Sequence, residues 1–169
     1  LARALVVDLP FALYSSPVPR AMETARTISR TTEAPITPMQ ELEEADAGEL
    51  EGLSGREMRE RYPEFARCWD RDSSSAHMPG GESLREVQER AWPAIVELSA
   101  THRDETVVAV THNFTIQAIV CGALELPLRN GLRLRQQVGA MTRLEIGGGD
   151  ASLVSLNETW HLASVPAHR

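Results

Sequence analysis

The chain contains no lysine: all 17 basic residues are arginine, against 24 Asp and Glu, so the formal net charge is −7. Without a basic excess, the sequence lacks the surface that general nucleic-acid or anionic-membrane binding requires. The negative charge is also local, because residues 41–60 hold eight acidic side chains and only two arginines. We therefore expect no nucleic-acid and no membrane partner, and we attribute the arginine count mainly to a coding bias.

Cysteine is nearly absent too. Cys68 and Cys121 are the only two, and they lie far apart in the sequence. This excludes a disulfide framework and favours a reduced, cytoplasmic setting.

No long hydrophobic run is present either: the longest stretch without a charged residue, 106–124, includes His112, Asn113 and Gln117. That stretch predicts a buried strand followed by a helix rather than a membrane span.

Strand and helix patterns alternate along the chain. Thr106–Val110 is apolar on both faces, as expected of a central strand in a parallel sheet. Ser83-Leu-Arg-Glu86 is a capping box that starts a helix, and Pro93 inside that helix is expected to kink or restart it. Other strands are predicted at 11–14, 36–39, 139–146 and 152–156, and other helices at 1–5, 17–30, from about 54, and 113–124.

This order of elements predicts an α/β fold. We expect a three-layer α/β/α sandwich built on a mostly parallel, mixed sheet, with the last two strands as a hairpin. No linker or repeat interrupts the sequence, and its 169 residues fit one domain, 1–169.

Polar residues follow two of the predicted strands at the point where each strand ends. Arg20 comes after Tyr14-Ser-Ser-Pro, and His112 and Asn113 come directly after the apolar strand. Ligands bind beyond the carboxyl ends of strands in open α/β sheets, and a helix N-terminus there favours an anion. Arginine and histidine at such a place predict a phosphate pocket. The alternative is that His112 is only structural.

A carboxylate on a glycine-containing loop adds to this pattern. Glu82 lies between Pro79-Gly-Gly and the helix cap Ser83. One interpretation is a general acid beside a phosphoryl leaving group. The other is a favourable charge near the helix dipole, with no catalytic role.

Taken together, several stretches resemble the histidine phosphatase superfamily, also called the phosphoglycerate mutase-like family. The matching stretches, which span nearly the whole chain, are Tyr14-Ser-Ser-Pro-Val-Pro-Arg20-Ala-Met-Glu-Thr-Ala25, residues 42–53, Pro79-Gly-Gly-Glu82-Ser-Leu, Val108-Ala-Val-Thr-His112-Asn and Leu156-Asn-Glu-Thr-Trp-His161-Leu. At position 113, asparagine stands where the family commonly has glycine.

The resemblance implies a phosphohistidine mechanism without a metal or cofactor. Arg20 would clamp the phosphoryl oxygens, and His112 would stabilise the transferring group beside the Asn113 N–H. Ser16, at the first junction, joins the expected substrate-binding residues. Glu82 would protonate the leaving alcohol and then activate water. Charge stabilisation and positioning would supply most of the rate.

The family's Arg-His-Gly motif, which carries the nucleophilic histidine, is absent: no Arg-His pair occurs in this sequence. We expect the motif to lie upstream of Leu1, on the first strand of the sheet, and we expect the chain as given to be inactive and poorly stable. The remaining histidines are not assigned to the nucleophile; they are His77, His102, His161 and His168.

The favoured function is a phosphomonoester hydrolase that acts on a small phosphorylated substrate. The short span between Tyr62 and Gly80 is more typical of the phosphatase members than of the mutases. The alternatives are a phosphoglycerate mutase-type phosphotransferase and a non-catalytic protein that binds phosphorylated ligands. Substrate identity is left open, as is a homodimer.

Overall fold

The computed structural model describes residues 1–6 and 11–163. The predicted alternation of strands and helices is confirmed, with most boundaries within two residues of expectation. His168, left unassigned above, lies outside the described residues. The helices are α1 (Ala2–Leu5), α2 (Pro19–Thr32), α3 (Gly55–Arg61), α4 (Pro63–Arg71), α5 (Leu84–Thr101) and α6 (Asn113–Ala123), and the strands are β1 (Phe11–Ser15), β2 (Ile36–Pro38), β3 (Thr106–Val110), β4 (Met141–Gly147) and β5 (Asp150–Glu158).

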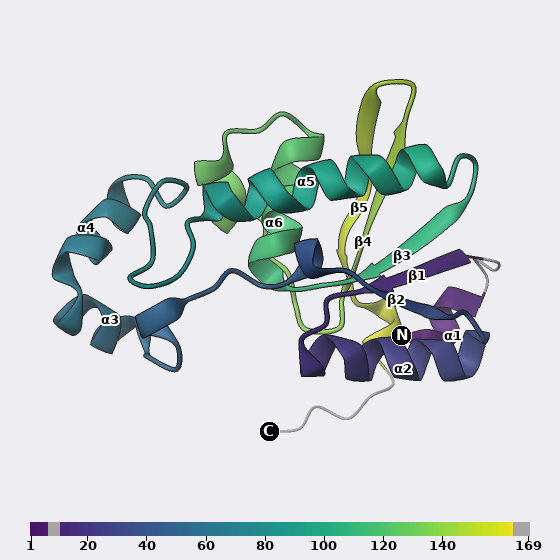
Figure 1. Cartoon of the computed structure of the whole chain (residues 1–169), viewed down its shortest axis with the longest axis horizontal. Coiled ribbons are helices and arrows are strands. Elements are labelled where there is room, and N and C mark those ends of the chain that lie inside the picture. The colour runs from purple at the N-terminus through teal and green to yellow at the C-terminus, as the bar shows by residue number, and fades with distance from the viewer. Residues whose placement is uncertain (7–10, 164–169) are drawn as a thin grey trace.

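The strands form a mixed α/β fold in layers, as predicted. β2, β1 and β3 make a parallel sheet in that order, and β4 and β5 make an antiparallel hairpin. Helices α1 and α2 cover one side of the strands, and α5 and α6 cover the other (Figure 1). Helices α3 and α4 lie at one end of the molecule, away from the sheet (Figure 1).

The structure corrects one expectation about the sheet. β3 was predicted to be central because it is apolar on both faces, yet among the described residues it pairs only with β1 and ends the parallel sheet. Four of its five residues are partly exposed and the fifth, Thr106, is exposed. The sheet is therefore in two parts, and an apolar strand lies at an edge.

Two clusters of apolar side chains hold the layers together. The first packs Leu13 of β1 against Ile28 of α2 and Leu5 of α1. The second joins α4, α5 and α6 through a set that includes Phe65 and Val87. Burying a side chain of this size contributes about 1.5–3 kcal/mol, so the two clusters fix the helices on both sides of the sheet.

Helix α5 begins as the sequence predicts and then continues further. The Ser83 hydroxyl accepts the N–H of Glu86, and the Glu86 carboxylate accepts the N–H of Ser83, which completes the capping box. Of the two alternatives at Pro93, a kink or a restart of the helix, the restart is wrong, because α5 runs through Pro93 to Thr101. A proline removes only one hydrogen bond of the helix, and the buried residues Val87, Ala91 and Leu98 lie on both sides of it.

Candidate active site

The two predicted strand–helix junctions meet at one edge of the sheet. β1 and β3 are parallel neighbours, with Ser15 opposite Val110, so both strands end at the same level. The N–H of Ser16 donates to the Val110 carbonyl at 2.9 Å, which carries the pairing one residue beyond β1. The chain after β1 therefore lies directly beside His112, the residue that caps α6.

His112 is a buried histidine whose ring is hydrogen-bonded to Ser16. Its side chain is 7% exposed, and its Nε2 atom lies 2.8 Å from the Ser16 hydroxyl, which is fully buried. Burial lowers the pKa of His112 to about 4, with a further contribution from the positive charges of Arg20 and Arg90. The imidazole is therefore neutral at pH 7, with one nitrogen engaged by Ser16.

Arg20, His112 and Asn113 line one end of a cavity of about 1950 Å³. Arg20 lies in the first turn of α2 and is exposed, and no described carboxylate pairs with it. Asn113 is the first residue of α6, and its N–H has no acceptor in the part of the chain that the structure describes. The structure thus brings three of the predicted residues, Arg20, His112 and Asn113, to the same cavity, where the Arg20 guanidinium and the Asn113 N–H have no described partner. Ser16, the fourth, bonds to His112 but does not line the cavity.

A carboxylate that sequence reasoning did not assign lies at the same end. Glu44 lines the cavity, and its Oε1 atom accepts the N–H of Phe114 at 3.1 Å and of Thr115 at 3.3 Å. These amides lie in the first turn of α6 and have no partner within the helix, and a negative charge is favourable at that end. The stretch around Glu44 was noticed as a matching segment, but eight acids crowd residues 41–60 and no local signal separates Glu44 from the others.

Glu82, the predicted general acid, lies outside the cavity lining. Its two carboxylate oxygens accept Nε and Nη2 of Arg90, each at 2.9 Å, and Oε2 also accepts the N–H of Asp46 at 3.1 Å. The hydrogen bond from Arg90 is the main reason that the pKa of Glu82 is lowered. Glu82 is thus held in an ion pair with a residue of α5.

Arg90 also ties down the segment that carries Glu44. Its remaining N–H groups donate to the backbone carbonyls of Glu41, Glu43 and Glu44 at 2.8, 3.0 and 3.1 Å. From the other side, the Thr115 hydroxyl donates to the Glu43 carbonyl at 2.6 Å. The backbone beside Glu44 is therefore held between α5 and α6.

Two glycines allow this segment to approach the loop before α5. A Cβ on Gly81 would lie 2.1 Å from the Asp46 carbonyl oxygen, and a Cβ on Gly48 would lie 2.3 Å from that of Pro79. The Glu82 N–H donates to the Asp46 carbonyl and the Glu49 N–H to the Pro79 carbonyl, both at 2.8 Å. Any side chain at Gly48 or Gly81 would push the two loops apart.

The other described histidines have partners away from Arg20. His102 Nε2 lies 2.9 Å from the Tyr14 hydroxyl, and His102 Nδ1 lies 2.8 Å from Glu105. His77 contacts Glu86, and His161 contacts the carbonyl of Gly139. None of these three is bonded to Arg20, Glu44 or His112.

Further features bear on cofactors and membranes. Within residues 1–6 and 11–163, no group of three or more His, Cys, Asp or Glu side chains is arranged to hold a metal ion. In the same residues, no helix is long and apolar enough to cross a membrane. Cys68 and Cys121 are both free thiols.

Comparison with known proteins places this arrangement in a family. Over its full length the chain is 28% identical to phosphoserine phosphatase 1 of Hydrogenobacter thermophilus, of which it covers 81%. Over 66% of its length it is 33% identical to a metal-independent phosphoserine phosphatase of Arabidopsis thaliana, of which it covers 48%.

Solved structures agree. A mycobacterial glucosyl-3-phosphoglycerate phosphatase superposes with a TM-score of 0.82 at 27% identity, over 94% of this chain and 81% of that one. Bacillus stearothermophilus YhfR superposes with a TM-score of 0.86 at 25% identity, over 95% of this chain and 80% of that one. The model of the histidine phosphatase superfamily (branch 1) matches residues 1–159. The chain therefore belongs to the histidine phosphatase superfamily.

Proposed function

We propose that this protein is a phosphomonoester hydrolase that acts through a phosphohistidine, with the phosphoryl-accepting histidine supplied by a segment that this sequence does not contain. The observation that carries the proposal is the meeting of Arg20, His112 and the free N–H of Asn113 at one end of the cavity. A cation and a helix N-terminus together match the charge and geometry of a phosphoryl group. The phosphatase relatives support hydrolysis and a small phosphorylated substrate.

Arg20 and the start of α6 have the simplest roles. The guanidinium can hold two phosphoryl oxygens at once, and the Asn113 amide can hold a third. Such donors are already in place before the substrate binds, so they stabilise the charge of the transferring group without reorganisation. Phosphoryl transfer depends mainly on this kind of positioning.

His112 completes the anion site. A phosphoryl dianion beside the imidazole would favour the charged form and raise its pKa from about 4. The imidazole would then gain a proton and a second strong donor when the ligand binds. Ser16 fixes the ring orientation through Nε2, so its role is to position His112.

The leaving alcohol needs a proton, and two carboxylates were candidates for giving it. Glu82 is held as a carboxylate by the ion pair with Arg90, outside the cavity lining. Glu44 lines the cavity, and no described cation pairs with its carboxylate. We therefore assign the proton donor to Glu44 and give Glu82 the role of holding the segment around Asp46.

Among the residues that the structure describes, we assign no histidine to the role of nucleophile. His112 is committed to Ser16, and His102 is bonded to Tyr14 and Glu105. The proposed nucleophile is therefore a histidine of a segment outside this sequence, placed beside Arg20.

The test is hydrolysis of p-nitrophenyl phosphate by the protein expressed from its natural gene. We expect turnover that chelators do not affect, and acid-labile, base-stable phosphate trapped on the protein after rapid quenching. Transfer of phosphate between sugar positions without release would indicate a mutase instead. Inorganic phosphate binding without any turnover would indicate the non-catalytic alternative.

A further inference from the structure

The side chain of Asn113 brings a second hydrogen-bonding group to the phosphate site, besides the backbone N–H. Its Oδ1 atom accepts a hydrogen bond from Nε2 of Gln117, one turn further along α6, at 3.2 Å. Its Nδ2 atom has no partner in the part of the chain that the structure describes, and the residue is exposed and lines the cavity. An amide NH₂ is therefore available next to the expected position of the phosphoryl group.

Gln117 determines which end of the Asn113 amide is left free. Gln117 is 6% exposed, and its Nε2 atom also donates to the Leu134 carbonyl at 2.9 Å. A carbonyl can only accept, so Nε2 and not Oε1 has to face Leu134, and the other hydrogen of Nε2 then faces Asn113. Asn113 must therefore turn Oδ1 toward Gln117 and leave Nδ2 free. The arrangement leaves Oε1 of Gln117 buried without a described partner, which costs stability, so Gln117 acts as a positioning residue for Asn113.

The loop 134–140, which Gln117 holds at its first residue, is fixed at further points. The N–H of Gln137 donates to Oδ1 of Asn157 at 2.7 Å. Nε2 of His161 lies 2.8 Å from the carbonyl oxygen of Gly139 and donates to it. Residues 136–140 line the cavity. The loop is therefore a fixed wall of the cavity near the start of α6.

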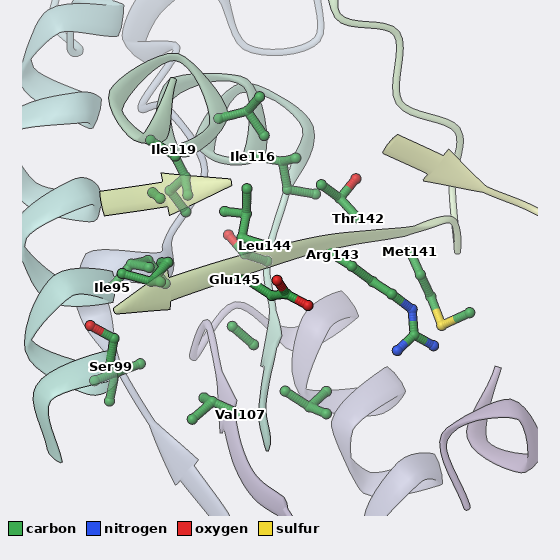
Figure 2. Close-up of a pocket in the computed structure, with 18 of the residues that line it drawn as sticks. Ile95, Ser99, Val107, Ile116, Ile119, Met141, Thr142, Arg143, Leu144 and Glu145 are labelled. Atoms are coloured by element: carbon green, nitrogen blue, oxygen red, sulfur yellow. The ribbon is translucent and has the colours of Figure 1, made fainter. Parts of the chain in front are cut away.

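The two glutamines of this loop differ in their partners. Oε1 of Gln136 accepts the hydroxyl of Thr142 at 3.0 Å. Thr142 lies on the side of β4 that faces Ile116 of α6, and Arg143 points to the opposite side (Figure 2). The side chain of Gln137 is exposed, lines the cavity and has no described partner. A second neutral amide is thus available near the start of α6.

Among the described residues, three arginines line the cavity, and only Arg20 is available at the phosphate site. Arg103 precedes β3, so it lies at the opposite end of that strand. Nε of Arg143 lies 3.5 Å from the carboxylate of Glu158. Glu44 adds a carboxylate to the cavity lining. A leaving alcohol that carried its own carboxylate would therefore face Glu44, and Arg20 would already be engaged by the phosphoryl group.

We propose that Asn113 and Gln137 form a subsite for the leaving alcohol, which selects an uncharged alcohol with further hydroxyl groups, such as a sugar or another polyol. The Asn113 NH₂ donates to a hydroxyl oxygen, and the Gln137 amide both donates and accepts. A site built to bond hydroxyl groups rejects an analogue without them, because its own polar groups are then left unpaired. The assignment rests on the proposed function, since it concerns the substrate of that reaction.

The experiment compares two phosphate esters of equal chain length in the protein expressed from its natural gene. Glycerol, esterified on a primary hydroxyl, carries two further hydroxyl groups, and propyl phosphate carries none. The readout is the ratio of their kcat/KM values, because effects common to both substrates cancel in it. Asn113→Ala keeps the backbone N–H and removes the amide, so the preference for glycerol phosphate should fall by about tenfold. An unchanged ratio in Asn113→Ala would overturn the subsite.

Gln137 has a matched control on the same loop. Gln137→Ala should lower the preference by about threefold or more, whereas Val138→Ala should leave it within about twofold of the parent. Val138 is 99% exposed and also lines the cavity, so it reports the effect of shortening a neighbouring side chain. Equal falls in the two variants would overturn the role of Gln137.

Gln117→Met tests the positioning role, since it keeps the length of the side chain and removes its donors. The preference for glycerol phosphate should fall in the parent and should not fall further in Asn113→Ala, because the group that Gln117 orients is then gone. A purely structural role would instead lower kcat/KM equally for the two esters, and that result would overturn the positioning role.

A third ester tests the chemical class, and binding separates the subsite from the proposed function. Glycerate esterified on its primary hydroxyl carries a carboxylate, and it should be a poorer substrate than glycerol phosphate; the reverse preference would overturn the uncharged class. Calorimetric Kd values for the esters give the same comparison without turnover. Selective binding that Asn113→Ala abolishes, with no hydrolysis, keeps the subsite and overturns the hydrolase. Hydrolysis with a ratio that Asn113→Ala leaves unchanged overturns the subsite alone.

Discussion

Glu44 and Glu82 are two carboxylates near the same end of the sheet, and their partners differ in kind. Glu82 is bound by the guanidinium of Arg90, with side chains that are 26% and 22% exposed. Glu44 lines the cavity, and the described donors to its carboxylate are the N–H of Ala45 and the N–H and hydroxyl groups at the start of α6. Glu82 thus has a charged partner, whereas the described partners of Glu44 are neutral donors.

The difference shows how one segment serves two purposes. Residues 41–46 include Glu44 and also Asp46, whose N–H donates to Glu82. Arg90 of α5 and Thr115 of α6 both donate hydrogen bonds to the backbone of this segment. Glu82 and Arg90 give the segment its position. Glu44 then lines the cavity at a fixed place, which the proposed proton transfer requires.

The largest expected effect is on catalysis. In the protein expressed from its natural gene, Glu44→Gln should lower kcat by about 10²–10⁴-fold, because the leaving group is no longer protonated. The loss should be larger for an alkyl phosphate than for p-nitrophenyl phosphate, since the alkoxide is the poorer leaving group. Steady-state kinetics with both substrates measures this.

Glu82→Gln is the matched control. It should stay within about tenfold of the parent, with a loss that is equal for the two substrates, because Glu82 acts through position and not through proton transfer. A loss that depends on the leaving group in Glu82→Gln, and not in Glu44→Gln, would exchange the two roles.

The next effect is on stability. Arg90→Gln should lower the free energy of unfolding by about 3–5 kcal/mol, because it leaves Glu82 without its cation and the carbonyl groups of Glu41 and Glu44 without a described donor. Arg56→Gln, which breaks the exposed pair with Glu60, should change it by less than about 0.5 kcal/mol. Urea unfolding of both variants measures the contrast, and equal effects would mean that the Arg90 network contributes no more than a surface pair.

The sequence singled out Arg20 and His112, which line the cavity, and did not single out Glu44, which lines it too, for a physical reason. Arg20 and His112 each follow directly from the end of a strand, and the rule that parallel strands end at one edge brings them together. Glu82 also stands at a recognisable position, before a helix cap. Its true partner, Arg90, is set by the direction in which the loop turns, which no local pattern encodes. Glu44 owes its place to contacts with α6, seventy residues away.

The fold was predicted with similar limits. The apolar pattern of residues 106–110 correctly indicated a strand, but its expected central position was wrong, because β3 lies at the edge of the parallel sheet. Hydrophobicity reports the environment that a strand suits and carries no information on which strand pairs with it, so the break between β3 and β4 was visible only in three dimensions. The helix pattern on both sides of Pro93 was predicted, and the alternative of a restart there is wrong because tertiary packing outweighs one lost hydrogen bond.

The pH dependence of stability distinguishes His112 from Glu82, because the two groups titrate in different pH ranges. Burial lowers the pKa of His112 from 6.5 to about 4, so between these values the unfolded chain binds a proton that the folded chain does not. Stability should therefore fall by about 3 kcal/mol as the pH drops from 6.5 to 4. The lowered pKa of Glu82 acts in the same direction but below pH 4.5, where the unfolded carboxyl takes its proton first.

Urea unfolding as a function of pH checks this, with His112→Asn as the variant. The slope between pH 6.5 and 4 should flatten in His112→Asn and persist in Glu82→Gln. A slope that is unchanged in His112→Asn would mean that another group titrates in this window and that His112 is not buried as a neutral ring.

The smallest effect concerns the hydrogen bond by which α6 holds the backbone of residues 41–46. Thr115→Val removes the hydroxyl that donates to the Glu43 carbonyl, yet that carbonyl keeps its bond from Arg90 at 3.0 Å. The expected loss is about 1 kcal/mol in the parent. In Arg90→Gln the same carbonyl would lose its last described donor, so the loss should rise to about 2 kcal/mol. A double-mutant cycle by urea unfolding measures this coupling, and strict additivity would mean that α5 and α6 hold the segment independently rather than through one shared carbonyl.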